Sequence, residues 1–284
     1  MKFLIIILCV VVELVGRLDA VRAVPLGLLE NYEASLQKRC KNWPPWNGPL
    51  GVLMAMIIPL FAVWVVFWIF SWVFFKFVLT ILFLLLSLGP KDLGSQIETY
   101  HAALAINDAA AVDSAAREIV DIPAHEEYAP DTKEVNRTVL VQANERVVAV
   151  LFWFLVLGPL GALAYRIASE FCSGAAERGS GFVDAANDLR RIMAWVPSRL
   201  LALGYAVAGS MVHSLEAWRI TETLGFEDNE TVLERAGLGA LYRADDVETR
   251  MEKDSADEVA DIRGLVNRTY FFLLTMLALL VLLS

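Results

Sequence analysis

The sequence has few of the residues that build disulfide frameworks or metal centres. Only three cysteines and three histidines occur among its 284 residues. The cysteines, Cys9, Cys40 and Cys172, form no C-x-x-C pair, and the histidines lie far apart in the chain. Neither a disulfide framework nor a cysteine- or histidine-rich zinc site is therefore expected. We expect no bound metal and no cofactor.

Basic charge and nucleotide-handling motifs are also scarce. The 33 acidic and 24 basic side chains leave a formal net charge of −9. A nucleic-acid partner would require a basic face that neutralises phosphates, so nucleic acid is not expected as a partner. The patterns G-x-x-x-x-G-K-[ST], H-E-x-x-H and G-x-S-x-G do not occur. Their absence argues against a P-loop nucleotidase, a zinc metalloprotease and a serine hydrolase.

Apolar residues, in contrast, are abundant. They make up 57% of the chain, against roughly 45–50% in a typical soluble domain. We therefore predict an all-α fold: a polytopic helical membrane protein in which residues 1–284 form a single membrane domain, with the lipid bilayer as a partner. Polar helical segments are expected at 89–146 and 214–268, and membrane spans at 3–16, 50–71, 73–88, 147–167, 200–212 and 269–283.

The segment 50–88 carries the strongest membrane signal. It is 39 residues long and its one formal charge is Lys76. At about 1.5 Å per helical residue it is roughly twice as long as a hydrocarbon core is thick, so we predict two spans with a turn near 71–76. Three tryptophans suit an interfacial belt near this turn, and Lys76 can extend its ammonium to the headgroups. They are Trp64, Trp68 and Trp72.

Two of the spans are left open. The segment 200–212 has 13 residues, which is marginal for crossing a bilayer. Residues 3–16 resemble a secretory signal peptide, but Glu13 falls where such a peptide is apolar, and this favours a retained helix. A carboxylate inside an apolar span is costly unless it is paired. We expect Lys76 or Arg166 to pair with Glu13.

The polar segments between the spans are predicted to be helical. Residues 93–120 and 133–146 are rich in helix-forming residues, and Pro123 and Pro130 mark the turn between them. Residues 245–263 are rich in acids, as expected of a solvated face.

Several runs of the sequence together resemble a known family. They are 134–139, 143–145, 151–154, 158–166 and 194–200. These runs resemble the core of the CobD/CbiB family of cobalamin-biosynthesis membrane proteins. Within that superfamily the chain resembles the AmpE group more closely, on the 100–108 stretch, the 50–88 hairpin and the terminal span. This resemblance implies a multi-pass protein of the bacterial inner membrane, linked to cell-wall recycling, β-lactamase induction and antibiotic resistance.

Two segments depart from the CobD/CbiB pattern. Synthases of that family resemble one another in an E-N-T-x-D-G segment before the third span and an N-T-x-D-S-M-x-G segment after it. The corresponding segments here are Asn-Glu-Arg-Val-Val-Ala at 144–149 and Ile-Ala-Ser-Glu-Phe-Cys-Ser-Gly at 167–174. A phosphate-handling or ATP-dependent condensation needs carboxylates to hold Mg²⁺ and polarise an acyl group. The loss of both motifs argues against that chemistry and against an enzyme.

The candidate site residues gather at the predicted membrane boundary and in the 93–120 helix. We expect some of them to bind an anionic small molecule. For Arg166 and Arg199 the alternative is a snorkelling anchor, for His101 a structural hydrogen bond, and for Asn107 and Asp108 a turn or an N-cap. The full set is Asn136, Arg137, Asn144, Glu145, Arg166, Arg199, His101, Asn107 and Asp108.

These observations lead to one expected function and two alternatives. The expected function is a non-catalytic signalling modulator of the inner membrane, with a protein partner in cell-wall recycling. The first alternative is a diverged CobD/CbiB-like membrane enzyme that handles an amide or phosphate group and uses Glu145, Asp108 and His101. The second is a scaffold that recruits a partner through its acidic 245–263 segment.

Overall fold

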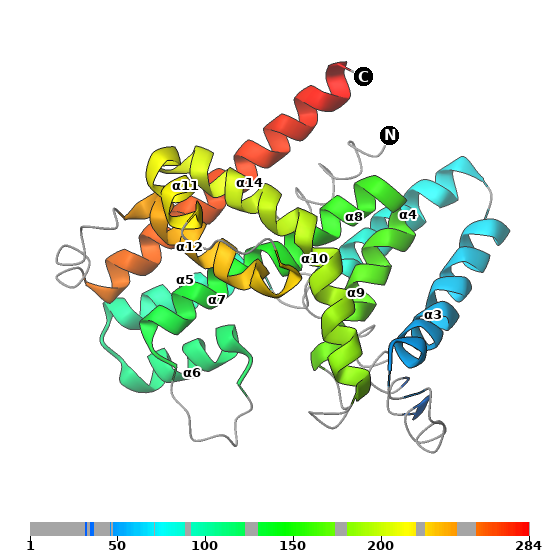
Figure 1. The fold of residues 1–284 in the computed structure, drawn as a ribbon, viewed down its shortest axis with the longest axis horizontal. Helices are drawn as coiled ribbons and strands as arrows, with labels where there is room; N and C mark the ends of the chain where they lie inside the picture. The colour runs from blue at the N-terminus through cyan, green and yellow to red at the C-terminus, as the bar shows by residue number, and fades with distance from the viewer. Residues whose placement is uncertain are drawn as a thin grey trace. The chain divides into compact units, whose positions relative to one another are not determined.

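The computed structural model describes most of the chain beyond residue 47. The described residues are 32, 35–36, 46, 48–70, 72–88, 92–122, 130–173, 181–219, 225–242 and 254–283. All regular structure in these ranges is helical (Figure 1), which confirms the predicted all-α class. The predicted span 3–16 and its carboxylate Glu13 lie outside the described residues.

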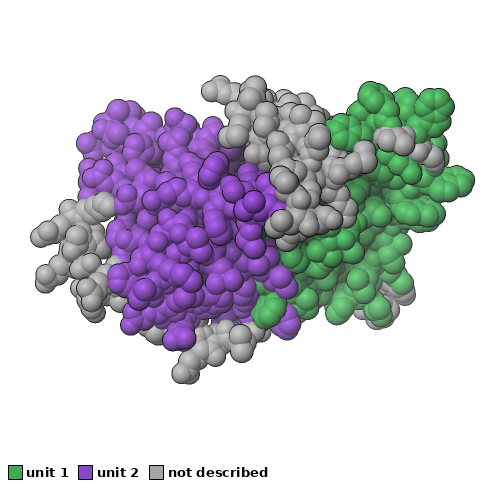
Figure 2. Space-filling model, turned by 90° about the horizontal axis from the view of Figure 1, so that it is seen from above, with its two compact units in different colours: residues 1–90, 145–195 green, residues 91–144, 196–284 purple. Residues whose placement is uncertain are grey.

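The chain divides into two compact units. Unit 1 comprises residues 1–90 and 145–195, and unit 2 comprises residues 91–144 and 196–284 (Figure 2, green and purple). Each unit is therefore built from two separate stretches of sequence. The helix α10, Gly181–Ala208, contributes its first part to unit 1 and its last part to unit 2.

Unit 1 contains α3 (Pro49–Ile69), α4 (Val73–Ser87), α8 (Ala149–Leu157), α9 (Pro159–Ser173) and the start of α10. Helix α9 packs against α3, α4 and α8. In the core, Phe182 stacks on Trp46 with ring centroids 5.0 Å apart and lies 5.4 Å from Phe171. The Trp153 indole donates a hydrogen bond to the Met193 carbonyl at 3.0 Å, and this bond joins α8 to α10.

Helices α3 and α4 correspond to the predicted spans 50–71 and 73–88. Pro49 occupies the first turn of α3, where a missing N–H costs nothing. Many large apolar side chains of both helices are exposed, as expected of a surface that faces lipid. They include Leu53, Ile57, Phe61, Trp64 and Trp68 on α3 and Phe74, Phe75, Val78 and Leu82 on α4.

In the described part of the chain, two helices are long and apolar enough to cross a membrane. They are Pro49–Ile69 and Thr132–Leu157, and a shorter apolar helix covers Phe74–Ser87. The polytopic architecture therefore remains a prediction. The second of these helices is continuous through α7 (Thr132–Ala143), the π-helix η2 (Asn144–Val148) and α8.

The segment predicted as the span 147–167 forms two helices in the structure. Helix α8 ends at Leu157, and α9 begins at Pro159. Between them Gly158 has φ 73° and ψ −157°, a conformation that is essentially restricted to glycine. Pro159 has no N–H with which to continue α8 and suits the first position of α9. The Gly-Pro pair therefore ends one helix and starts another.

Unit 2 is a helical assembly around α7 and α14. It contains α5 (Leu93–Ala105), α6 (Ala109–Val120), α7, the end of α10, α11 (Met211–Arg219), the short η3 (Phe226–Asp228), α12 (Asn229–Leu241) and α14 (Ser255–Leu283). Helix α14 packs against α5, α7 and α12, and α12 packs against α7 and α11. The largest fully buried side chains of this core include Tyr100, Ile119, Leu140, Leu201 and Tyr205.

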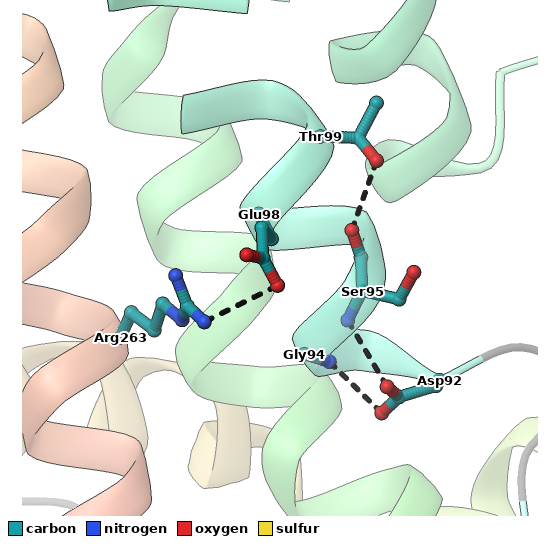
Figure 3. Close-up of polar contacts among 6 residues, drawn as sticks. All are labelled: Asp92, Gly94, Ser95, Glu98, Thr99 and Arg263. Atoms are coloured by element: carbon teal, nitrogen blue, oxygen red, sulfur yellow. Dashed lines mark hydrogen bonds and ion pairs between the residues drawn. The ribbon is translucent and has the colours of Figure 1, made fainter. Parts of the chain in front are cut away.

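Polar contacts fix α5 within this unit (Figure 3). The Asp92 carboxylate caps the helix by accepting hydrogen bonds from the backbone N–H groups of Gly94 and Ser95, both at 3.1 Å. Two turns later, Glu98 lies 3.4 Å from the Arg263 guanidinium of α14. This ion pair is exposed, and it joins α5 to α14 at the surface.

The predicted helix 93–120 is wrong at its middle. Helix α5 ends at Ala105 and α6 begins at Ala109, because Asn107 adopts a left-handed φ of 53° and Asp108 caps α6. The Asp108 carboxylate accepts hydrogen bonds from the N–H groups of Ala110 and Ala111, both at 3.1 Å. The turn and N-cap alternative for these two residues is thus confirmed.

The last two predicted spans also differ from the structure. The segment 200–212 is not one helix, because α10 ends at Ala208, α11 starts at Met211, and the Ser210 N–H donates to the Ala240 carbonyl at 2.8 Å. The segment 269–283 is the C-terminal half of the 29-residue helix α14. Residues 255–263, the last part of the predicted acidic segment 245–263, form the start of α14. Glu258 is buried there.

Candidate functional site

Arg137 on α7 lies between two carboxylates of α12. Its Nη2 atom is 3.6 Å from a Glu230 carboxylate oxygen, and its Nε atom is 3.2 Å from a Glu234 carboxylate oxygen. The three side chains are 47%, 43% and 32% exposed, so the cluster is accessible to a solute. Glu230 and Glu234 are one helical turn apart, so both lie on the face of α12 next to α7.

Arg199 on α10 fixes the start of the same helix. Its guanidinium donates hydrogen bonds to the Asn229 side-chain oxygen, to the Gly225 carbonyl at 3.1 Å and to the Ser198 hydroxyl at 2.9 Å. The Ser198 hydroxyl also donates to the Asn229 oxygen at 3.3 Å. Partial burial lowers the pKa of Arg199, and the nearby Asp228 carboxylate acts in the opposite direction.

The structure thus brings Arg137 and Arg199 to the first turns of α12. They contact the neighbouring residues Glu230 and Asn229, respectively. Three acids, Asp228, Glu230 and Glu234, also lie in the residues that begin this helix. An anion that binds Arg137 must therefore compete with two carboxylates. Two carboxylates beside one guanidinium are more typical of a reactive site, in which acidic and basic groups act together, than of a site that only binds an anion.

Two other predicted site residues, Glu145 and Arg166, lie in unit 1 and have ion-pair partners there. Glu145, in the π-helix, pairs with Arg190 of α10. Arg166 pairs with Glu170 one turn along α9. All four side chains are largely buried. The predicted set of boundary residues is therefore divided between the two units.

Asn136 and Asn144 are both buried on the α7 side of unit 2. Each is 1% exposed. The Nδ2 atom of Asn136 and the Oδ1 atom of Asn144 are buried and have no hydrogen-bond partner in the structure. Such groups are rare in folded proteins and call for an explanation.

The remaining predicted residues are not part of the α12 cluster. His101 lies partly buried on α5, Asn107 forms the exposed turn before α6, and Asp108 caps that helix. Lys76 is exposed on α4, where its carbonyl accepts a hydrogen bond from Thr80. A role for these residues in ligand binding remains a prediction.

Sequence reasoning missed several partners that the fold supplies. Glu230 and Glu234 carry a weak signal, because an i, i+4 pair of acids faces one side of a helix. Nothing in the local sequence indicates that this pair meets Arg137, which lies far away in the chain. The same holds for Arg190 opposite Glu145 and for Asn229 opposite Arg199.

Comparisons with known proteins give a consistent result. The family model described as CobD/CbiB protein matches residues 7–240. The chain is 30% identical over 168 residues to a cobalamin biosynthesis protein CobD of Stutzerimonas stutzeri, covering 57% of this chain and 54% of that protein. It is 29% identical over 170 residues to the protein of the same name from Chromobacterium violaceum, covering 58% and 54%. The chain thus spans about half the length of these curated relatives. No solved structure matches it significantly.

Proposed function

Because the chain belongs to the CobD/CbiB family, we propose that it is a diverged membrane enzyme of that family. Its substrate carries an amide or phosphate group, and its reactive cluster is formed by Arg137, Glu230 and Glu234. One of the carboxylates acts as a general base toward the substrate, and the Arg137 guanidinium binds an anionic part of the substrate. Membership of the family supports a role for this chemistry in cobalamin biosynthesis.

The expectation of a non-catalytic signalling modulator is wrong. It followed from the closer resemblance to the AmpE group and from the two departed carboxylate segments. The curated relatives are named as cobalamin biosynthesis proteins instead, and the family model covers residues 7–240. Within the family, we propose that the chain shares its nearest ancestry with the AmpE group. This shared ancestry implies no signalling role.

The observation that supports the proposal most directly is the convergence of two carboxylates on Arg137. Without the family's acidic segments, the sequence offered Asp108 and Glu145 as candidate carboxylates. In the structure Asp108 caps a helix and Glu145 pairs with Arg190, so the two do not form a carboxylate pair. Glu230 and Glu234 offer the missing pair, at 3.6 and 3.2 Å from one guanidinium. We further propose a multi-pass location in the bacterial inner membrane, supported by the exposed apolar side chains of α3 and α4.

Complementation tests this proposal. A bacterial strain that lacks its CobD protein and depends on supplied cobalamin is given the wild-type gene or variants. We expect the wild type to restore growth without cobalamin, and the double variant Glu230→Gln/Glu234→Gln and the single variant Arg137→Ala to reduce growth to the level of the empty vector.

The exposed ion pair in Figure 3 provides the matched control. Glu98→Gln and Arg263→Ala remove an ion pair of similar length from the same unit, and both variants should support growth as the wild type does. Failure of the wild type to restore growth contradicts a role in cobalamin biosynthesis. Equal growth with wild type and the Glu230/Glu234 variant, at equal protein levels, contradicts the assignment of the cluster.

A further inference from the structure

A π-helix interrupts the apolar helix Thr132–Leu157. It covers Asn144–Val148, and neither proline nor glycine occurs in it. A π-turn is less stable than an α-turn and appears mostly where function requires it. The widened turn also changes the hydrogen bonding of the carbonyls that precede it.

Two tyrosine hydroxyls bind those carbonyls within unit 2. Tyr205 of α10 donates to the Leu140 carbonyl at 2.9 Å, and Tyr270 of α14 donates to the Ala143 carbonyl at 3.1 Å. Tyr205 is fully buried. The protein therefore satisfies the backbone acceptors beside the π-helix with side chains from two other helices.

One polar atom of the Asn144 side chain, which directly follows these carbonyls, has no hydrogen-bond partner. Its Oδ1 atom is buried and accepts no hydrogen bond, in a side chain that is 1% exposed. Asn136, two turns earlier on the same helix, has a buried Nδ2 atom with no acceptor. A buried polar atom without a partner lowers stability, and an apolar side chain of similar size would avoid that cost. Retaining the amide at such a cost is typical of a functional position.

The surroundings indicate what kind of group would bind there. Asn144 Oδ1 is an acceptor, so the missing partner is a donor. The groups beside it along the same helix are the Leu140 and Ala143 carbonyls and the tyrosine hydroxyls that bind them. These groups are uncharged, and burial of a charged donor without a counter-ion is costly. A neutral donor, such as an amide N–H or a hydroxyl, can donate to Asn144 Oδ1 and needs no counter-ion.

We propose that Asn144 forms a subsite for a neutral hydrogen-bond donor, an amide or hydroxyl group of the substrate, beside the π-helix. This inference rests on the proposed enzymatic function for the identity of the substrate, but not for the existence of the subsite.

Thermal unfolding of the purified, detergent-solubilised protein provides the first test. Asn144→Leu replaces the amide by an apolar group of similar size, so we expect its Tm to rise by about 2–4 °C. Asn229→Leu is the matched control, because the buried Asn229 oxygen accepts hydrogen bonds from Ser198 and Arg199. Its Tm should fall. A lower Tm for Asn144→Leu would show that the amide is structural and would overturn the proposal.

Binding provides the second test, with propanamide, propylammonium chloride and sodium propionate as probes. We expect propanamide alone to raise the Tm of the wild type relative to that of Asn144→Leu. In the complementation assay, growth with Asn144→Leu should be at least tenfold lower than growth with the wild type. A higher Tm with unchanged activity and no propanamide effect would indicate a resident water and overturn the subsite. If wild type fails to complement but the propanamide effect is present, the proposed function fails and the subsite stands.

Discussion

At the residue scale, two arginines of unit 2 hold α12 in place. Arg199 contacts its first residue and the carbonyl of Gly225 before it, while Arg137 contacts its first two turns. Hydrogen bonds to a charged group contribute more than neutral ones. The same contacts that would orient a substrate therefore also stabilise the fold.

Arg199→Ala tests this structural role. Loss of the hydrogen bonds to Gly225 and Asn229 should lower the free energy of unfolding by about 1.5–3 kcal/mol. Circular dichroism during thermal unfolding in detergent measures the change. Arg219→Ala, on the exposed end of α11, is the control and should stay within about 0.5 kcal/mol of the wild type. Equal effects of the two substitutions would show that Arg199 is only a surface cation.

The sequence predicted some single-residue roles and not others. The turn or N-cap role of Asn107 and Asp108 could be predicted, because capping depends on residues two or three positions away. The pairing of Arg137 with Glu230 and Glu234 could not, because it depends on how α7 packs against α12. That Asn144 Oδ1 has no partner could not be predicted either, because it depends on which side chains of α10 and α14 reach α7.

At the element scale, apolar composition located the helices better than it located their ends. The runs that became α3 and α4 were predicted closely, since a long uncharged run leaves few alternatives to a helix. The segment 147–167 was predicted as one span, whereas Gly158 and Pro159 divide it into α8 and α9. The π-helix gave no signal, because its sequence, Asn-Glu-Arg-Val-Val, contains no helix breaker.

Gly158→Ala tests the break between α8 and α9. At φ 73° and ψ −157° a Cβ atom is strained even though nothing lies within 4 Å of it, so unfolding free energy should fall by about 1–3 kcal/mol. Gly264→Ala, in α14 and also with open space around it, should instead gain up to about 1 kcal/mol. Thermal unfolding of both variants provides the comparison, and a Gly158→Ala variant as stable as the wild type would exclude the positive-φ conformation at this position.

At the scale of the whole molecule, the exposed apolar side chains of α3 and α4 predict stable insertion into a bilayer. Large exposed apolar faces of this kind are not stable in water. In cell fractionation, the protein should stay in the membrane pellet after alkaline carbonate and leave it only with detergent. Replacing Phe61, Trp64 and Trp68 together by Ser should weaken this retention. Release of the wild type by carbonate would contradict a spanning helix.

Family membership changed the functional interpretation more than the fold did. The missing acidic segments are real departures, and from the sequence they argued against catalysis. The structure places another pair of carboxylates, Glu230 and Glu234, beside Arg137. A chemical requirement that appears unmet along the chain can thus be met by residues that only folding brings together.

The central claim is that this chain catalyses a reaction of its family. The most direct measurement incubates the purified protein with cobyric acid, Mg-ATP and an amino alcohol, free or phosphorylated, and detects new products by mass spectrometry. We predict an amide-linked product with the wild type and with Arg263→Ala, and at least a hundredfold less with Glu230→Gln/Glu234→Gln. No product from the wild type, or equal product from all three proteins, would contradict the claim.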